Sequence, residues 1–565
     1  MGLRWIIGKQ DIEMGNNKKG GFIMQAGILA AAGIIVRVIG ILYRSPLVAI
    51  IGDEGNGYYN TAYSIYTIIL LVSSYSIPSA LSKVMAERLA KREYRNAQKI
   101  FHCAFLYVIA VGGVGSIVCF ACADMFVGHN SAAVLRIFAP TIFLSGLLGV
   151  LRGYFQAHRT MLQTSLSQIL EQIFNAVISI LAAHLLIQAV AERDTTTQAI
   201  YGAAGSALGT GIGVLIALIF MWLIYLLNRP SVLKRVNRDK TREELSYGQV
   251  FGIIIGMVTP VILSTCIYNL STVSNLKFYQ ELTQIFKGYS EVQATTSYGL
   301  YSGKAMQIIN IPVAIASSMS AAIIPTIART YEVHAREETN YKIAQAIKVT
   351  MLISIPCAVG LFALAKPVVL LLYPQKATVN MVASLIRVMA AAVVFYALST
   401  LTNAVLQGTG KVNKPVVHAL VSLIAQTAVL IPLLLYTSLD LYALCIATLV
   451  YSFLMCLMNG ISIKKHLNYR QEVMRTFVLP FFSAFWMGAA AALVYYGLKK
   501  IMELAGMTQS EVIRNVICLV PSLLVAVLVY FALVIKSGAI NKKELKSMPK
   551  GHLLLRIAQK LHLIR

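Results

Sequence analysis

The sequence predicts an all-α protein that crosses a membrane many times. Of its 565 residues, 57% are hydrophobic and only 13% are charged, and the mean hydropathy is +0.70. A soluble domain of this size could not keep such a composition in solution. Apolar segments also recur along the whole chain, and a helix of about 20 residues crosses the ~30 Å hydrocarbon core of a bilayer. These observations predict a polytopic membrane protein.

About fourteen apolar segments, separated by polar turns, are the predicted transmembrane helices. They cover approximately residues 22–50, 58–82, 100–123, 132–151, 164–190, 198–227, 248–276, 297–325, 345–372, 380–406, 416–437, 441–463, 476–498 and 513–535. The eight cysteines lie nearly all inside these segments. Cys119 and Cys122 have the spacing of a redox or metal pair, but no second ligand pair accompanies them, so we interpret them as buried apolar residues.

The basic residues of the loops predict the orientation of these helices. Lys and Arg total 49 against 23 Asp and Glu, which gives a net charge of +26. The excess is concentrated in residues 4–19 and in the segments 83–99, 229–242, 329–348, 464–475 and 536–565, which all fall on one side of the predicted membrane. By the positive-inside rule, both termini are therefore predicted to be cytoplasmic. The orientation of the helices in the membrane therefore accounts for the net positive charge, and no nucleic-acid partner is expected.

The first twelve segments divide into two halves of six that resemble each other weakly. After the second and eighth segments, Ile77-Pro78 and Arg92-Glu93 recur as Ile324-Pro325 and Arg336-Glu337. In the fourth and tenth segments, Leu135-Arg136 matches Ile386-Arg387, and VLRG (150–153) matches VLQG (405–408) if one helical turn is inserted in the tenth. Six helices each in the same orientation predict parallel repeats with a cleft between them, an architecture typical of alternating access.

The repeat predicts six parts of the chain. They are a cytoplasmic N-terminus (1–21), an N-lobe (22–227), a basic cytoplasmic linker (228–247), a C-lobe (248–463), two further helices (464–535) and a basic amphipathic tail (536–565). We expect the tail to lie on the inner leaflet, because basic amphipathic stretches bind anionic membrane surfaces.

The first apolar segment contains two arginines, Arg37 and Arg44. They are seven residues apart, about two helical turns, so both side chains leave the same face. Gly33 and Gly40 share that face and permit close helix approach. Because a charge inside a bilayer usually faces a protein interior or water, this face is predicted to be one wall of a cationic cavity. Two alternatives stay open: Arg44 snorkels to the headgroups from the outer end, or Arg37 forms a structural ion pair.

Three further polar residues are candidate site residues. Glu171 shares a helical face with Gln168 and Asn175, and it is a candidate partner for Arg37, either as a structural ion pair or as a proton-linked site. The repeat places Gln426 opposite Glu171. Lys304, near the start of the eighth segment, has no acid close in sequence and is either cavity-facing or interfacial.

The seventh segment is unusually polar, and Pro260 predicts a kink in it. Asn269 and its neighbours in this segment either line the cleft or hydrogen-bond to adjacent helices, and the neighbours are Thr259, Ser264, Tyr268 and Ser271. No phosphate-binding glycine loop with its lysine and no HExxH motif is present. We therefore expect a protein that is not an enzyme and that has no catalytic residue, metal site or cofactor.

Three stretches carry a resemblance to a known family. RVIGILYRSPLVAIIGDEGNGYYNTAYSIY (37–66), SIPSALSKVMAERLAKREY (76–94) and AMQIINIP (305–312) resemble the MOP flippase superfamily, in its polysaccharide biosynthesis or stage V sporulation protein B-like branch, related to the MurJ lipid II flippases. The resemblance covers nearly the whole chain. It implies two six-helix lobes, a central cationic cavity and two extra helices that form a groove for lipid tails.

The resemblance also implies a function and some roles. Arg37 and Arg44 match the first-helix arginines of the MurJ pattern, and Lys304 roughly matches its eighth-helix arginine. Two features differ from the MurJ pattern. Arg37 and Arg44 are seven residues apart instead of six, and Ser45 follows Arg44 where the pattern has an aspartate. The acids of the MurJ sodium site have no counterpart, so a proton or the membrane potential is left open as driving force.

The implied protein is a monomer in the bacterial plasma membrane that contacts membrane lipids. It is expected to move an undecaprenyl-pyrophosphate-linked, lipid II-like precursor to the outer leaflet. A flippase for another lipid-linked polysaccharide unit and a MATE-like cation-coupled exporter are the alternatives.

Overall fold

The computed structural model describes residues 20–75, 77–158, 160–239, 244–505 and 510–541, together with residues 556, 559 and 560. These ranges contain helices and connecting turns and no strand, which confirms the predicted all-α class. Most of the predicted N-terminal segment 1–21 and of the tail 536–565 lies outside the described residues. The chain forms two compact units, Met1–Cys266 and Ile267–Arg565.

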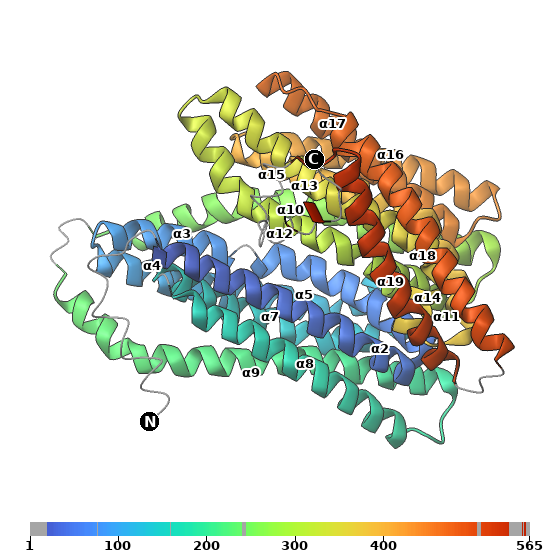
Figure 1. The fold of residues 1–565 in the computed structure, drawn as a ribbon. Helices are drawn as coiled ribbons and strands as arrows, with labels where there is room; N and C mark the ends of the chain where they lie inside the picture. Colours follow the sequence, from blue (N-terminus) through green and yellow to red (C-terminus); the bar gives the residue numbers. More distant parts are fainter. Residues whose placement is uncertain are drawn as a thin grey trace. The chain divides into compact units, whose positions relative to one another are not determined.

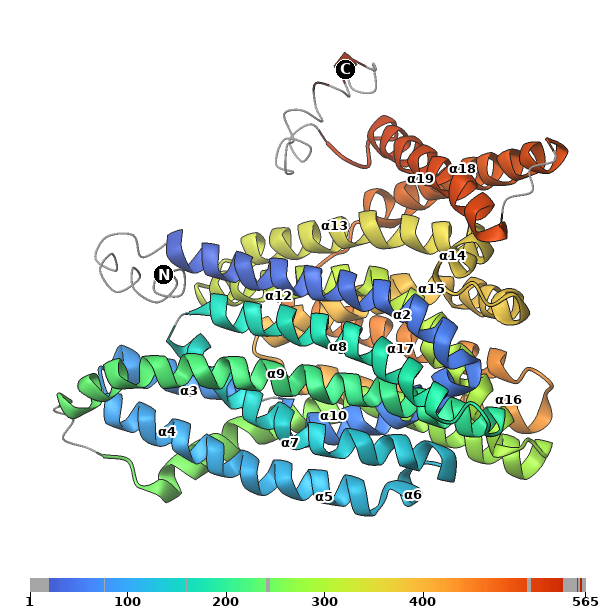
Figure 2. The same cartoon turned by 90° about the horizontal axis from the view of Figure 1, so that it is seen from below.

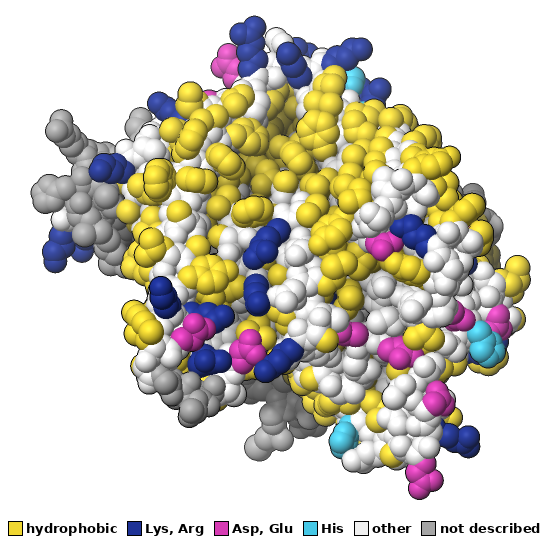
Figure 3. Space-filling model, turned by 90° about the vertical axis from the view of Figure 1, so that its right-hand side faces the viewer, with side chains coloured by type: hydrophobic (Ala, Val, Ile, Leu, Met, Phe, Trp, Pro, Cys, Tyr) yellow, Lys and Arg dark blue, Asp and Glu magenta, His cyan; other side chains and the backbone are white. Residues whose placement is uncertain are grey.

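Eleven helices within the described residues are long and apolar enough to cross a membrane. The predicted count of fourteen is not confirmed. One span, Ala32–Ser73, overlaps both of the first two predicted segments, and the seventh and eighth correspond to helices outside the eleven. Hydrophobic side chains cover much of the face drawn in Figure 3, which suits contact with lipid tails.

Unit 1 consists of the following elements in chain order. They are α2 (Gly20–Leu70), the π-helical turn η1 (Leu71–Tyr75), α3 (Ile77–Ala90), α4 (Tyr94–Tyr107), η2 (Val108–Gly112), α5 (Gly113–Ala121), α6 (Ala123–Phe126), α7 (His129–Ala157), α8 (Met161–Ala189), α9 (Thr195–Asn237) and the first part of α10 (Tyr247–Lys287). Within it α2, α8 and α9 lie side by side (Figures 1 and 2).

Unit 2 contains the rest of α10 and the elements that follow it. They are α11 (Glu291–Gly299), the π-helical turn η3 (Leu300–Ala305), α12 (Met306–Glu332), α13 (Arg336–Ala363), α14 (Ala365–Leu372), α15 (Lys376–Gly408), α16 (Asn413–Tyr436), α17 (Leu441–Leu467), η4 (Met474–Val478), α18 (Leu479–Leu504) and α19 (Glu511–Lys536). Helices α18 and α19 pack side by side, with Met487, Tyr495 and Leu519 in their apolar contact (Figure 2).

Helix α2 contains the first predicted segment and the start of the second, and it turns sharply at Gly52. The φ of Gly52 is 70° and its ψ is −179°, a conformation open to glycine because it has no Cβ. The sequence GDEG (52–55) therefore divides α2 into two helical segments, one before and one after Gly52.

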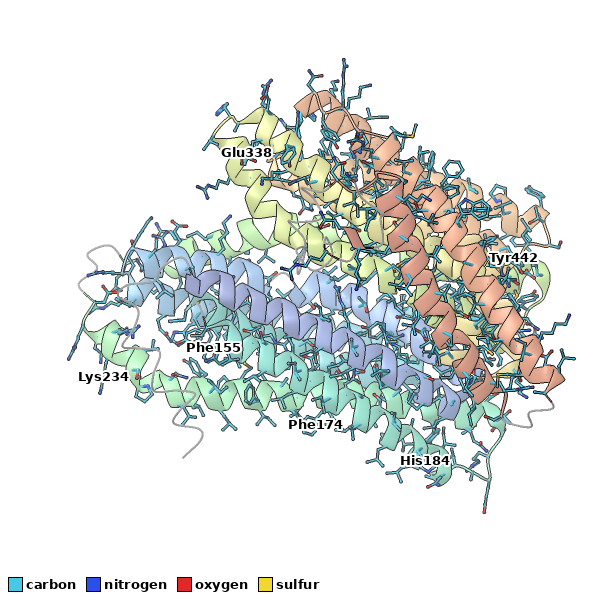
Figure 4. All side chains as sticks on the ribbon, in the orientation of Figure 1. Phe155, Phe174, His184, Lys234, Glu338 and Tyr442 are labelled. Atoms are coloured by element: carbon cyan, nitrogen blue, oxygen red, sulfur yellow. The ribbon has the colours of Figure 1, made fainter. Side chains whose placement is uncertain are left out.

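The pairing of α8 with α9 depends on three glycines of α9, four residues apart: Gly205, Gly209 and Gly213. A Cβ added at Gly213 would lie 2.7 Å from the carbonyl O of Glu171, and one at Gly209 would overlap the backbone of Ser179. Small residues at this spacing allow two helix backbones to approach closely in a membrane. Figure 4 shows His184 and Lys234 at opposite ends of this long hairpin.

We expect Gly209→Ala to lower the stability of the protein by at least the ~1–3 kcal/mol that overpacking typically costs, because the added methyl meets backbone atoms that cannot rotate away. Thermal unfolding of the purified protein measures this change. Gly497→Ala in α18 is the matched control, since nothing lies within 4 Å of its Cβ position. Equal stability of the two variants would contradict the close packing of α8 and α9.

The predicted linker 228–247 begins within a helix, because α9 continues to Asn237 through Pro230. Residues 240–243 lie outside the described part. The next residues are held to α4: Lys99 donates to the carbonyl O of Leu245 at 2.7 Å, and Arg95 pairs with Glu244 at 3.0 Å. Hydrogen bonds from Asn96 and Arg88 hold the pKa of Glu93 below its ordinary value. The last residues of the predicted linker are thus tied to unit 1.

A turn with the same geometry follows α3 in unit 1 and α12 in unit 2. Arg92 has a φ of 63° and His334 one of 58°. The amide of Glu93 donates to the carbonyl of Arg88 at 3.0 Å, and that of Ala335 to the carbonyl of Thr330 at 3.1 Å. The two turns therefore match Arg92 with His334. The sequence match of Arg92 with Arg336 was wrong by two residues.

The register of α7 and α15 also differs from the sequence match. From Leu135 to the end of α7 there are as many residues as from Ile386 to the end of α15. The turns that follow agree, because Thr160 donates to Phe155 at 3.0 Å and Lys411 to Leu406 at 2.8 Å. No inserted turn is needed, so Arg152 corresponds to Asn403 instead of Gln407. In the same register Glu171 corresponds to Ser422 instead of Gln426.

Candidate functional site

The two arginines of α2 lie on the part of this helix that precedes Gly52. The helix is continuous from Arg37 to Arg44, so the seven-residue spacing places both side chains on one side of it. Arg37 is exposed and Arg44 is half-buried. Each takes part in a polar or electrostatic contact within the protein. An adjacent face of α2, with Tyr43, Leu47 and Ile51, packs against Ala176 and Ala183 of α8.

Arg44 lies beside an aromatic cluster in unit 1. Its charge acts on Tyr59 and Tyr63 of the same helix after the Gly52 break. Tyr66 stacks on Phe138 of α7 with ring centroids 4.7 Å apart, and Tyr59 lies 5.5 Å from the same ring. The break at Gly52 therefore brings the tyrosines within electrostatic range of the arginine.

Glu171 pairs with Arg152 of α7, so the predicted pair of Glu171 with Arg37 was wrong. Nη2 of Arg152 donates to Oε2 of Glu171 at 2.7 Å, and its Nε donates to Oγ of Ser167 at 2.9 Å. The side chains are 16% and 30% exposed, respectively. The face of Glu171 continues in Asn175, whose Oδ1 accepts from Ser179 at 2.9 Å. The acid thus cross-links α7 and α8.

Lys304 is buried in unit 2, within the π-helical turn η3, and only 1% of it is exposed. Its Nζ donates to Oε1 of Gln375 and, at 3.0 Å, to Oγ1 of Thr378. It also lies 5.7 Å from the centre of the Tyr373 ring, within cation–π range. These three partners are neutral, and they hold the ammonium at the start of α15.

Asn269 lies on α10 and is half-buried. The side chains of Ser264 and Tyr268 are outside the described residues, but the following turns of α10 bond to α16. Ser271 donates to Oε1 of the fully buried Gln426 at 2.7 Å, and Gln426 donates to Asn275. Ser271 therefore bridges two helices, which was the second of the two predicted roles, and the role of Asn269 stays a prediction.

The sequence interpretation missed two features of the site. Arg152 was treated only as part of a repeat match, although an arginine near the end of an apolar segment was a visible candidate partner for Glu171. The glycines of α9 form a GxxxGxxxG pattern that was not used. Among described residues, no group of three or more His, Cys, Asp or Glu is placed to hold a metal ion.

The comparison with known families gives a clear result. A family model described as the lipid II flippase MurJ matches residues 78–517, which is more than half of the chain. The protein is a member of the MurJ family. This MurJ-family chain is 23% identical over 552 residues to the stage V sporulation protein B of Bacillus subtilis (strain 168), and the match covers 95% of this chain and 99% of the relative.

Two solved structures share the fold of this MurJ-family protein. The inward closed conformation of the lipid II flippase MurJ matches with a TM-score of 0.62 at 15% identity, over 89% of this chain and 97% of that one. An inward-facing multidrug resistance MATE transporter of the MOP superfamily also matches with a TM-score of 0.62, at 14% identity, over 78% of this chain and 98% of that one. At these identities each likeness shows the fold alone.

Proposed function

We propose that this MurJ-family protein is a flippase that moves an undecaprenyl-pyrophosphate-linked, lipid II-like precursor from the inner to the outer leaflet of the plasma membrane. The observation that carries the proposal is the pair of arginines on one side of α2, inside the span Ala32–Ser73. A cation at such a depth is costly unless it meets water or an anion. A pyrophosphate supplies the anion.

Arginine suits this role because its planar fork binds phosphate oxygens in pairs, whereas lysine acts as a point charge. We propose Arg37 and Arg44 as pyrophosphate contacts, and Asn269 and Lys304 as further candidate contacts of the headgroup. Lys304 must first leave Gln375 and Thr378 to take part. Glu171 is assigned to the structural pair with Arg152.

The proposed cycle is alternating access. The polar head crosses inside the protein while the prenyl tail stays in lipid. No bond is made or broken, so the protein is proposed to act as a transporter and not as an enzyme. Both termini are proposed to be cytoplasmic, and the protein to work as a monomer. The driving force is assigned to the membrane potential or a proton, because α10 and α16 meet through neutral groups at Gln426.

Two other cargoes are compatible with the fold. The first is another lipid-linked polysaccharide unit, which the same arginines would bind through the same pyrophosphate. The second is a cationic drug, as in the MATE transporters, but two arginines on α2 would repel a cationic compound. The MurJ family match and the charge of α2 therefore favour an anionic lipid-linked cargo.

A leaflet-specific assay with purified protein in vesicles tests the proposal. Lipid II, an undecaprenyl-pyrophosphate carrying a different saccharide, and a cationic dye are supplied to separate vesicles. We expect lipid II to change leaflets at a rate that depends on the protein and the dye not to move. Movement of the second lipid alone would assign the other polysaccharide cargo, and movement of the dye alone would contradict the flippase proposal.

A further inference from the structure

A cluster of four aromatic rings lies in unit 1 beside Arg44. Phe138 of α7 and the α2 residues Tyr59 and Tyr66 are buried, with at most 5% of their surface exposed, whereas Tyr63 of α2 is half-buried. The ring of Tyr63 is stacked on that of Tyr59, with centroids 5.7 Å apart and planes 13° from parallel. It also meets the ring of Phe138 edge-on, at a centroid distance of 5.9 Å. Tyr63 is therefore the ring of this cluster that a ligand can reach, and the buried rings hold it in place.

The charges near Tyr63 show that its ring does not point into lipid. Arg44 and, on α8, Glu171 both act electrostatically on Tyr63. A side chain directed at the bilayer would meet apolar chains instead of a cation and a carboxylate. Arg44 is eight residues before the Gly52 break and Tyr63 eleven residues after it, so they lie roughly 12 and 16 Å from the break along the two parts of α2. The arginine and the ring are therefore at similar distances from the break.

Two half-buried residues of α8 have polar atoms that the protein does not use. Oε2 of Glu171 accepts from Arg152 at 2.7 Å. Oδ1 of Asn175 accepts from Ser179 at 2.9 Å and from Thr210 at 3.3 Å. Among the described residues, Oε1 of Glu171 and Nδ2 of Asn175 have no hydrogen-bond partner. The first atom accepts and the second donates, and the two residues are one helical turn apart, which suits the hydroxyl groups of a saccharide.

Unit 2 repeats one tyrosine of the aromatic cluster. The turns at Arg92 and His334 match, and 33 residues before them stand Tyr59 and Tyr301. Both tyrosines are buried, and each is hydrogen-bonded to a threonine, Tyr59 to one of α9 and Tyr301 to one of α17. This tyrosine is therefore part of the framework that both units share.

The accessible ring and the open amide are not repeated in unit 2. In the same count Tyr63 corresponds to Ala305, which is fully buried. In the register of α8 and α16, Asn175 corresponds to Gln426, which is fully buried and bonded to α10. The fold of a unit therefore requires neither feature, and unit 1 has both beside Arg44.

We infer that Tyr63 is a platform on which the saccharide next to the pyrophosphate stacks, and that Glu171 and Asn175 bind its hydroxyl groups. The inference rests on the proposed function, because it assigns the part of the cargo that adjoins the phosphates bound by Arg44. The C–H groups on one face of a sugar ring are attracted to the negative face of an aromatic ring. The charges order the headgroup in the same sense, since the arginine attracts the pyrophosphate while the carboxylate repels it and faces the uncharged sugar ring.

Binding of two lipids to the full-length protein in detergent tests the platform. The probes are lipid II and undecaprenyl pyrophosphate, which share the prenyl chain and the pyrophosphate and differ in the saccharide. Tyr63→Leu is expected to weaken the binding of lipid II roughly tenfold and that of undecaprenyl pyrophosphate by less than about twofold. Tyr63→Phe keeps the ring, so it should keep the wild-type ratio of the two affinities. Asn175→Ala should shift this ratio in the same direction as Tyr63→Leu.

Tyr66→Leu is the matched control, because Tyr66 is a buried member of the same cluster and stacks on Phe138. This change should lower the thermal stability and leave the ratio of the two affinities unchanged, since a loss of folded protein affects both lipids equally.

Hydroxyl-radical labelling of the wild-type protein is a second measurement that needs no variant. Lipid II is expected to reduce the oxidation of Tyr63 several-fold, and undecaprenyl pyrophosphate to reduce it much less. Oxidation of Tyr436, which is 85% exposed in unit 2, should change with neither lipid.

Equal losses of affinity for both lipids in Tyr63→Leu, or oxidation of Tyr63 that lipid II does not reduce, would overturn the inference and leave the proposed function standing. A wild-type protein that binds neither lipid and moves neither in vesicles would overturn the proposed function together with the inference.

Discussion

Replacing Arg37 or Arg44 with alanine is expected to reduce the rate of lipid flipping by about 10–100-fold each, since a hydrogen bond to a charged group contributes ~1.5–3 kcal/mol. Arg37→Lys should keep part of the activity if the charge alone matters, and little if the paired geometry of the guanidinium matters. The leaflet-specific assay in vesicles measures the rate, and membrane abundance is measured in parallel.

The half-buried position of Arg44 beside Tyr59 and Tyr63 sharpens this test. If Arg44 only anchored a helix end at the headgroups, Arg44→Lys would be nearly silent, because lysine snorkels equally well. Arg136→Ala is the matched control, since Arg136 pairs with Asp124 on the exposed surface of unit 1. Normal flipping by an abundant double variant, Arg37→Ala with Arg44→Ala, would rule out the arginine contact with the pyrophosphate.

The second large effect is expected at Glu171. Glu171→Gln leaves the guanidinium of Arg152, 16% exposed, without its carboxylate partner. Removing one partner of a buried ion pair costs ~3–5 kcal/mol, and partial exposure of Glu171 places the expected loss near the lower end of that range. Thermal unfolding in detergent measures it. The double change Arg152→Gln with Glu171→Gln should recover most of the stability, because unit 2 manages with neutral residues at the matching positions.

A double-mutant cycle identifies the true partner of Glu171. The effects of Glu171→Gln and Arg152→Gln should be strongly non-additive, while those of Glu171→Gln and Arg37→Ala should add within ~0.5 kcal/mol. The reverse outcome would restore the pair that the sequence suggested. The cycle is independent of transport, so it remains informative even if both variants stop flipping.

The helices were predictable because the apolar pattern that predicts each helix lies within that one stretch of the chain. Each predicted apolar segment falls within an observed helix or a short series of helices, since about 20 apolar residues suffice to define one. The ion-pair partner of Glu171 could not be predicted from one stretch of the chain. Its choice between Arg37 and Arg152 depends on how closely α7 and α8 approach, and the sequence does not contain that distance.

The repeat shows a second reason why a prediction from the sequence was wrong. The letters VLRG and VLQG suggested a register that is wrong by one helical turn, because Val, Leu and Gly are common in apolar helices and match by chance. The ends of α7 and α15 are set by backbone hydrogen bonds, which give the register without reference to residue types. The burial of Lys304 could likewise not be predicted from the sequence, since its hydrogen-bond partners, Gln375 and Thr378, are more than 70 residues away.

The wide turn η3 gives Lys304 a way to change its direction. A π-helical turn holds one more residue than an α-helical turn. If the extra residue of Leu300–Ala305 moves along the chain to another turn, each side chain that it passes rotates about the helix axis by roughly 100°, the angle of one residue. Such a displacement breaks only a few backbone hydrogen bonds at a time. It would swing the ammonium of Lys304 away from Gln375 and Thr378 while both ends of the helix stay in place.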